Sequence, residues 1–154
     1  RRRRRRRMLE LLLVGADVAF HPAYQALPQA CAEVWVDGYL VGRTRWQDRA
    51  ALAQGAAHWM DRLRISRGGS QLVFRALLGA PAGGGLPSPS EVCAAEGRAD
   101  LQALLLRFPD GQRSSVNLFR GVDWAGQLFF ELRSCSLAAV AAAPVAVGGA
   151  SFAA

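Results

Sequence analysis

Lysine is absent from this chain of 154 residues, and isoleucine and asparagine occur once each, at Ile65 and Asn117. All 19 basic residues are therefore arginine. This bias, together with abundant alanine, glycine and proline, is typical of a GC-rich genome and excludes no fold. The hydrophobic content of 51% is too high for a disordered chain, and it is sufficient for one domain with a core.

Cysteine and histidine are also scarce. Cys31, Cys93 and Cys135 are widely spaced, odd in number and form no C-x-x-C motif, which argues against a disulfide scaffold and against zinc. Such cysteine usage fits a reducing compartment. His21 and His58 have no partner at ligand spacing, so packing or surface positions are favoured for both. We expect no metal site and no cofactor.

Motifs for catalysis are missing. The chain has no G-x-S-x-G sequence, no phosphate-binding P-loop and no G-x-G-x-x-G that opens a helix. The glycine-rich run at 79–85 is not followed by Lys-Ser or Lys-Thr, which favours a linker. Acidic residues are scattered and do not pair as a general acid and base. We therefore expect a protein that is not an enzyme.

The net charge of +7 comes from one end of the chain. Arg1–Arg7 form an unbroken block, whereas the 12 arginines that follow are matched by 12 acidic residues. A like-charge block of this kind predicts a solvated, disordered arm at 1–7. Binding of nucleic acid or of an anionic membrane through this arm is the alternative function. An inert tail is the competing interpretation.

The spacing of apolar residues predicts helices in the first half of the chain. Two stretches, 31–43 and 46–65, repeat apolar residues at intervals of three and four, which places them on one helical face. These residues are Cys31, Ala32, Trp35, Val36, Tyr39 and Leu40, followed by Leu52, Ala56, Trp59 and Leu63. A Gly/Pro/Ser-rich cluster at 79–90 is a predicted loop.

Helical signals continue in the second half. Ser90 is a predicted N-cap for a helix over 91–108, because leucines and a phenylalanine follow at helical spacing and Pro-Asp-Gly ends the pattern. A short helix is then expected to end at Gly121, and Asp123 to cap a last helix that begins at Trp124. That last helix is apolar on most sides, which favours a central position in a bundle.

The sequence therefore predicts an all-α fold, a helical bundle around a central apolar helix, as one domain over 8–154. The uncharged end at 134–154 is expected to be a buried core helix, with a membrane segment as the alternative. A secretory signal is not expected, because Glu10 and Asp17 interrupt the first apolar run. A hairpin around Asp110-Gly111, as in ubiquitin-like regulatory domains, is the alternative to helix near 104–119.

One stretch resembles a known family. The sequence LFRGVDWAGQLFFEL at 118–132 is similar to the first homology motif of the Bcl-2 apoptosis regulators, which reads Leu-Phe-Arg-Asp-Gly-Val-Asn-Trp-Gly-Arg before an apolar run with Phe-Phe. The matching residues are Leu118, Phe119, Arg120, Gly121, Val122 and Trp124, with Asp123 in place of the family's asparagine. Weaker likenesses lie at 57–69, to the first helix, and at 93–108, to the second helix of the groove.

The resemblance implies a hydrophobic groove that holds the death-motif helix of a pro-apoptotic partner. The residues it assigns to this groove are Leu101, Leu104, Leu105, Phe108, Phe119, Arg120, Gly121, Val122, Asp123, Trp124, Gly126 and Phe130. Gly126 falls where the family has an arginine, so binding would depend on apolar anchors. The family's second motif and last helices have no counterpart among the 22 residues after Leu132.

Together with the GC-rich composition, the resemblance implies a divergent viral member of parapoxvirus type. The expected function is anti-apoptotic: the protein would sequester partners of the Bax, Bak, Bid and Puma type and inhibit death of the host cell. The expected location is the host cytoplasm or the mitochondrial outer membrane, with membrane association as a further expectation. For any single groove residue, packing in the core is the competing interpretation.

Overall fold

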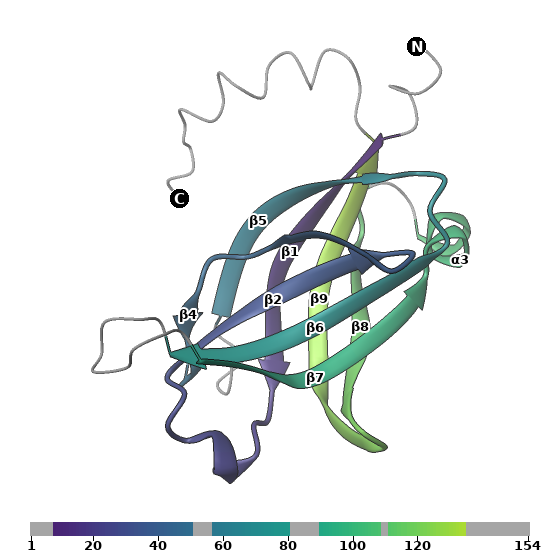
Figure 1. Cartoon of the computed structure of the whole chain (residues 1–154). Coiled ribbons are helices and arrows are strands. Elements are labelled where there is room, and N and C mark those ends of the chain that lie inside the picture. The colour runs from purple at the N-terminus through teal and green to yellow at the C-terminus, as the bar shows by residue number, and fades with distance from the viewer. Residues whose placement is uncertain (1–7, 51–56, 81–89, 109–110, 135–154) are drawn as a thin grey trace, which may run out of the picture.

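The structure is a computed structural model that describes residues 8–50, 57–80, 90–108 and 111–134. These residues form a β-sandwich with two layers of antiparallel strands (Figure 1). The first layer contains β2 (Gln29–Val36), β3 (Tyr39–Arg43), β6 (Gln71–Ala80) and β7 (Ser90–Asp100), and the short β4 (Gln47–Asp48) pairs with β2. The second layer contains β1 (Met8–Val18), β5 (Ala57–Ser66), β8 (Arg113–Arg120) and β9 (Asp123–Ser134).

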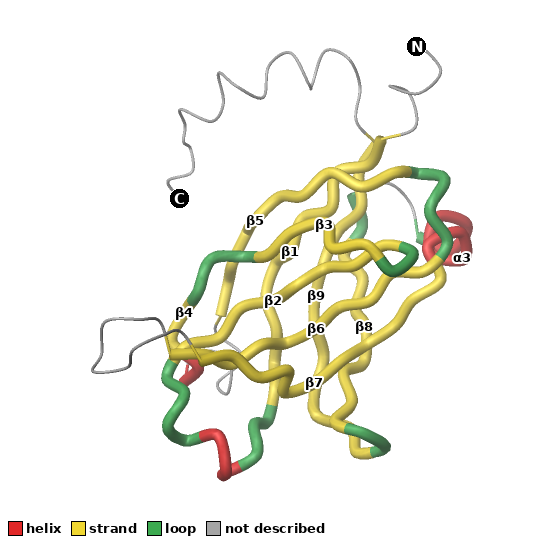
Figure 2. Tube along the Cα trace, in the orientation of Figure 1, coloured by secondary structure: helices red, strands yellow, loops and turns green. Residues whose placement is uncertain are grey.

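Short helical segments accompany the strands. The 3-10 helix η1 (Pro22–Tyr24) lies in the connection from β1 to β2, and α3 (Leu101–Arg107) follows β7 at the other end of the sandwich (Figure 2). Asp100 caps α3, because its carboxylate accepts hydrogen bonds from the backbone N–H groups of Gln102 and Ala103. Within the described part of the chain, no helix is long and apolar enough to cross a membrane.

The strands run in the order β3-β2-β6-β7-β8-β9-β1-β5, and all neighbouring pairs are antiparallel. The two layers join where β7 meets β8, with Glu96 opposite Phe119. A Cβ added at Gly97 would lie 2.4 Å from the backbone oxygen of Asn117, so glycine allows β7 to pass closely over β8.

The core fills the space between the layers. Phe74 of β6 stacks on Phe130 of β9 with ring centroids 5.0 Å apart, and the side chain of Trp59 is fully buried in the same core cluster. In β8 the side chains alternate, because Val116 and Leu118 are buried while Ser115 and Asn117 are exposed. This period of two is the pattern of a strand with one face on a core.

Tight turns join the strands into hairpins. Asp37 and Gly38 have φ values of 48° and 85°, the backbone of a two-residue turn between β2 and β3. The Asp37 carboxylate accepts hydrogen bonds from the backbone N–H groups of Gln71 and Ser70, which lower the pKa of Asp37. Gly121, with φ of 64°, and Val122 make the corresponding turn between β8 and β9.

The predicted all-α bundle is wrong. The stretch 31–43 forms β2 and β3, and within 46–65 the described residues form β4, two helical residues at 49–50 and most of β5. The predicted helix pair around Gly121 is the β8–β9 hairpin, in which backbone groups pair across strands instead of along a helix. Apolar residues on both faces of buried strands produce spacings of three and four by chance, which explains the error.

The predicted helix over 91–108 is correct only near its end. Residues 90–100 form β7, and α3 begins at Leu101 with Asp100, not Ser90, as its cap. The alternative to helix over 104–119, a hairpin, is also wrong, because 104–107 belong to α3 and β8 pairs with β9 instead. The predictions for the arm at 1–7 and for 135–154 fall outside the described residues, as does most of the predicted loop at 79–90.

Candidate functional site

The tip of the β8–β9 hairpin exposes large apolar side chains. Val122 is 94% exposed, Trp124 61% and Phe119 41%, and Arg120 lies between them in the sequence. The hairpin is at the opposite end of the sandwich from α3, and it protrudes at the bottom of Figure 1. Because apolar side chains on one protruding turn cannot reach the core, this tip is a candidate contact surface.

The exposed tryptophan is held in place by polar contacts. The Nε1–H of Trp124 donates to Oδ1 of Asn117 at 3.2 Å, and the amide of Gln127 donates to the same oxygen at 3.2 Å. Asn117 and Trp124 lie on adjacent strands, so the indole is fixed against the outer face of the hairpin. A rigid exposed aromatic side chain loses little conformational entropy when it binds.

A groove begins beside this hairpin. It is open to solvent and has a volume of about 710 Å³ at the junction of the two layers, where β7 and β8 diverge on either side of their pairing at Glu96 and Phe119. Its lining residues are Glu96, Gly97, Arg98, Ala99, Ser115, Val116, Asn117, Phe119 and Gly121. The groove and the exposed tip therefore share Phe119 and the turn, and they form one continuous surface.

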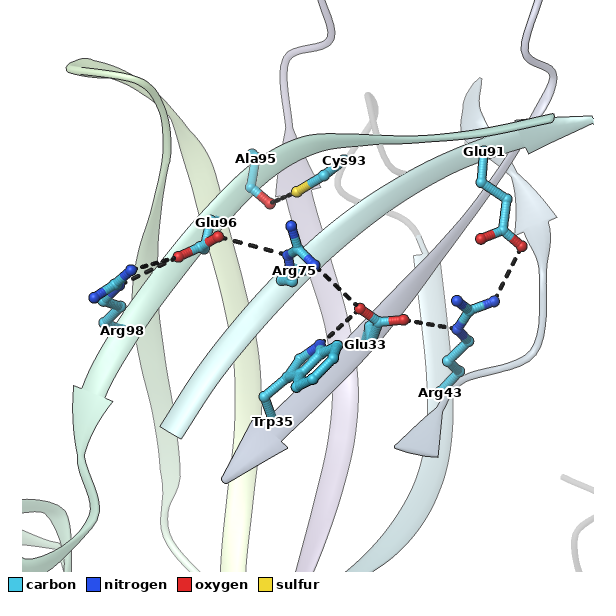
Figure 3. A network of polar contacts seen from close by, with 9 residues as sticks. All are labelled: Glu33, Trp35, Arg43, Arg75, Glu91, Cys93, Ala95, Glu96 and Arg98. Carbon is cyan, nitrogen blue, oxygen red and sulfur yellow. Dashed lines mark hydrogen bonds and ion pairs between the residues drawn. The ribbon is translucent and has the colours of Figure 1, made fainter. Parts of the chain in front are cut away.

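The outer face of the first layer carries a chain of ion pairs (Figure 3). At its centre is Glu33, whose side chain is only 3% exposed. One of its carboxylate oxygens accepts a hydrogen bond from Nε1 of Trp35 at 2.7 Å, and the other accepts one from Nε of Arg43 at 2.8 Å. The hydrogen bond to Glu33 raises the pKa of Arg43.

The chain continues in both directions from Glu33. Arg43 also contacts Glu91 at 3.0 Å, and Arg75 contacts Glu33 at 3.7 Å and Glu96 at 3.5 Å. Arg98 completes it with a 3.1 Å contact to Glu96. We call this set the arginine–glutamate face; its members are Glu33, Trp35, Arg43, Arg75, Glu91, Glu96 and Arg98. Its three arginines and three glutamates cancel in charge, so it is no basic patch.

A similar arrangement lies on β9. The carboxylate of Glu131 is shared by Arg133 at 2.9 Å and Arg113 at 3.2 Å. The hydrogen bond from Arg133, followed by the one from Arg113, lowers the pKa of Glu131. These contacts join β8 to β9 near the end of the sandwich that carries α3.

The cysteines provide no obvious reactive centre. Burial raises the pKa of the Cys31 thiol to about 12, so that thiol stays protonated, while Cys93 is exposed beside the arginine–glutamate face. Among the described residues, no group of three or more His, Cys, Asp or Glu side chains is placed to hold a metal ion. Cys135 lies outside the described residues.

The residues predicted to form a peptide groove do not come together. Leu101, Leu104 and Leu105 lie on α3, and Phe108 follows it, at one end of the sandwich. The residues at the opposite end are Phe119, Arg120, Gly121, Val122, Asp123, Trp124 and Gly126. Leu101 and Phe130 are fully buried in the core. The interpretation as a groove between helices is therefore wrong.

Sequence reasoning missed the polar residues beside the hairpin. Glu96, Arg98 and Ser115 were assigned no role, and neither was Asn117, the single asparagine of the chain. The signal was present in β8, where Ser115, Asn117 and Phe119 alternate with buried residues. That alternation marks them as one outward face of a strand.

Comparison with known proteins shows the fold. No model of a protein family matches this chain, and no curated protein matches it. Solved structures do match: a C2 domain of plant Extended Synaptotagmin 1 has a TM-score of 0.58 at 12% identity, covering 85% of this chain and 97% of that domain. Another C2 domain matches with a TM-score of 0.52 at 10% identity over 84% of this chain and 99% of that one.

A third match is to CC2D1B, described as acting in the mitotic reformation of the nuclear envelope. It has a TM-score of 0.57 at 14% identity and covers 84% of this chain but 55% of that protein. At these identities the likeness shows the fold alone, a sandwich resembling C2 domains. It overturns the resemblance to the Bcl-2 family, and with it the anti-apoptotic function and the helical partners of the Bax, Bak, Bid and Puma type.

Proposed function

We propose that this chain is a non-catalytic module that binds peripherally to anionic membranes through the tip of the β8–β9 hairpin. The observation that carries the proposal is the exposure of Val122, Trp124 and Phe119 at the tip of one hairpin, next to Arg120. Tryptophan is favoured at the boundary between lipid headgroups and acyl chains, where its ring is buried and its N–H stays among polar groups. Arginine beside it would contact lipid phosphates.

The expected binding is weak and reversible. Complete burial of an apolar side chain contributes about 1.5–3 kcal/mol, and a basic residue near an anionic surface adds about 1 kcal/mol. A partly inserted tip with two apolar residues and one arginine therefore reaches about 4–6 kcal/mol, which corresponds to dissociation constants between about 1 mM and 0.05 mM. Such a module would bind membranes transiently, unless a second contact adds to the first.

The fold supports this proposal. C2 domains are typically calcium- and lipid-binding modules that target membranes. The described residues offer no acidic cluster that fits a calcium ion, so no step of the proposal is assigned to calcium. The apolar hairpin is sufficient for the contact that we propose. Location in the cytoplasm stays a prediction.

The hairpin and the arginine block at 1–7 are separable contacts. Met8, where β1 begins, lies at the end of the sandwich opposite to the hairpin (Figure 1). The 11 residues of β1 span about 36 Å. Seven residues extend at most about 25 Å. When the hairpin is inserted and the strands stand upright, the block would not reach the same membrane.

The test is co-sedimentation of the full chain with vesicles of phosphatidylcholine, with and without phosphatidylserine. Val122→Asp should weaken binding at least about tenfold, because a carboxylate replaces an apolar side chain at the anionic surface. The matched control is Leu106→Asp, since Leu106 is 91% exposed but lies on α3 at the other end. It should bind as the unchanged chain does.

Two results would contradict the proposal. Equal losses for Val122→Asp and Leu106→Asp would show that the effect comes from charge and not from the hairpin. Full binding by Val122→Asp, combined with loss of binding when residues 1–7 are removed, would assign the membrane contact to the arginine block.

A further inference from the structure

The geometry points to a ligand site in the groove between β7 and β8: we infer that it binds a neutral, hydroxyl-rich ring, that is, a sugar ring. The inference rests in part on the proposed function, because the groove shares Phe119 and Gly121 with the hairpin that we place in the membrane. The sugar would belong to a glycolipid headgroup or to a free oligosaccharide, and titration with free glycosides and with vesicles distinguishes these sources.

The walls of the groove come from β7 and β8, which pair only at Glu96 and Phe119 among the described residues. Glu96 and Arg98 project from β7, and Ser115, Asn117 and Phe119 project from β8. The close approach at Gly97 brings the two strands together beneath these side chains. The volume of about 710 Å³ lies within the usual range of small-molecule sites, about 300–1,000 Å³.

The amide of Asn117 is oriented for a ligand. Its Oδ1 already accepts two hydrogen bonds, from Trp124 and from Gln127, and this fixes which side of the amide is oxygen. The NH₂ group is then the half that remains to donate into the groove. Ser115, two residues earlier on the same face, adds a hydroxyl that both donates and accepts.

Arg98 and Glu96 complement these groups from the opposite wall. Arg98 donates from Nε and Nη2 to one carboxylate oxygen of Glu96, at 3.2 and 3.1 Å. Among the contacts of the described residues, the Nη1 amino group of Arg98 has no hydrogen bond, so it can donate to a ligand oxygen. Glu96 keeps lone pairs for a ligand hydroxyl. A hydroxyl group both donates and accepts hydrogen bonds, so it can bond to the donor Arg98 and to the acceptor Glu96 of this wall.

The charge of the groove favours a neutral ligand. Arg98 is neutralised by Glu96 within the same wall, and no further basic residue of the described chain lines the groove. A phosphate or carboxylate ligand would meet the carboxylate of Glu96 at close range, which is unfavourable. A sugar ring carries many hydroxyls and no charge.

Phe119 supplies the remaining feature that a sugar ring needs. Phe119 is 41% exposed at the end of the groove next to the hairpin. The C–H face of a pyranose is apolar and gains from burial against an aromatic ring, while its hydroxyls point outward to the polar walls. Because the groove is open and the hydrogen bonds are few, a single sugar should bind with millimolar affinity.

The first experiment titrates methyl α-glucopyranoside and methyl β-galactopyranoside into the ¹⁵N-labelled full chain and follows the indole N–H signal of Trp124 by NMR. Trp124→Phe identifies this signal. We expect a saturable shift with at least one glycoside, since a ligand on Asn117 perturbs the bond that Trp124 donates to it. Ser115→Ala and Arg98→Gln should each weaken binding at least about fivefold.

A matched control separates the groove from general charge effects. Arg62→Gln removes an arginine that is as exposed as Arg98 but lies on β5, paired with Glu10. It should leave the titration unchanged. No saturable shift with either glycoside, together with no added binding to glycolipid vesicles, would overturn the inference. A titration that is the same in Ser115→Ala, Arg98→Gln and the unchanged chain would also overturn it, because the sugar would then bind elsewhere.

The second experiment compares vesicles of phosphatidylcholine with and without galactosylceramide. Added binding that Arg98→Gln removes, with no binding of free glycoside, assigns the site to a lipid headgroup. Binding of both assigns it to the ring itself, whether free or attached to lipid. Loss of binding to phosphatidylserine vesicles in Val122→Asp reports on the hairpin alone, so failure of the groove and failure of the proposed membrane contact give different results.

Discussion

The arginine–glutamate face and the tip of the β8–β9 hairpin differ in whether their side chains have partners within the molecule. On the face, every arginine has a carboxylate partner and the central Glu33 is buried. At the tip, the large apolar side chains of Val122 and Trp124 project into solvent. The face contains most of the conspicuous charge of the first layer, yet its charges are paired within the molecule. The tip has few polar groups, yet it is the surface that a partner could still stabilise.

This contrast shows where a function should be sought. A cluster of charged residues in a sequence suggests a binding site, but a cluster whose opposite charges pair with each other mainly holds strands in place. An exposed apolar group is the more informative observation, because folding alone does not explain it. The following variants test whether the two regions are separate in this sense, with stability as the property of the face and binding as the property of the tip.

The largest effect is expected from Glu33→Ala. Removing the carboxylate leaves Arg43, Arg75 and the indole N–H of Trp35 without their shared acceptor. We expect a loss of about 3 kcal/mol in the free energy of unfolding. This value is at the lower end of the range for breaking a buried ion pair, because Arg43 and Arg75 are both over one-third exposed. Urea denaturation measures this loss, and vesicle binding by the folded variant should not change.

The control for Glu33 is Glu91→Ala on the same face. Glu91 is 36% exposed and contacts only Arg43 among the described ion pairs. Its removal should cost less than about 1 kcal/mol. Equal losses for the two variants would mean that the burial of Glu33 has no energetic importance.

Gly97→Ala should have the next largest effect, because it acts on the junction between the two layers. The added Cβ would lie 2.4 Å from the backbone oxygen of Asn117 and 2.9 Å from a methyl group of Leu118. Strand β7 must shift, and we expect a loss of about 1–3 kcal/mol in urea denaturation. Gly68→Ala is the control, since its Cβ would have no neighbour closer than 3.8 Å. Similar stability of the two variants would contradict the close packing of the junction.

Two tryptophans allow a direct comparison of the regions. Trp124→Ala should weaken vesicle binding about tenfold, or about 1.4 kcal/mol, with little change in the unfolding free energy, because the ring is exposed. Trp35→Phe should lower the unfolding free energy and leave vesicle binding unchanged. It removes the hydrogen bond to Glu33 and changes no residue of the β8–β9 tip. Its expected cost is about 1 kcal/mol of stability. If both variants changed binding equally, the face and the tip would not be separate.

The sequence carried more of this fold than the predicted helices suggest. Asp37-Gly38 stands between Val-Trp-Val and Tyr-Leu-Val, and Asp-Gly between two short runs rich in β-branched and aromatic residues is a strong signal for a hairpin. In β9 the signal is weaker, because Leu128 and Phe130 are buried but Phe129 between them is also apolar. The helical spacing of apolar residues predicted the right element at α3, where Leu101, Leu104 and Leu105 lie on a helix.

Other features could not be derived from sequence. The arginine–glutamate face draws its residues from β2, β3, β6 and β7, and their contacts depend on strand register that only the folded sheet defines. The likeness of 118–130 to a helical motif failed because a short run of residues does not determine its own backbone. The turn at Gly121 and Val122 fits a hairpin once Arg120 pairs with Asp123.

The smallest effect concerns Glu131, which resembles the arginine–glutamate face on the opposite layer. Its pKa is lower in the folded protein than its ordinary value of 4.5, because Arg133 and Arg113 stabilise the carboxylate. The unfolded chain therefore binds a proton more readily. The stabilisation by Glu131 is complete above about pH 4.5 and is lost as the pH falls through the folded pKa. Unfolding free energies measured from pH 6 to pH 3 should decline less steeply in Glu131→Gln than in the unchanged chain. Identical slopes would show that the two arginines do not stabilise the carboxylate, and vesicle binding at neutral pH should be the same in both proteins because Glu131 lies far from the tip.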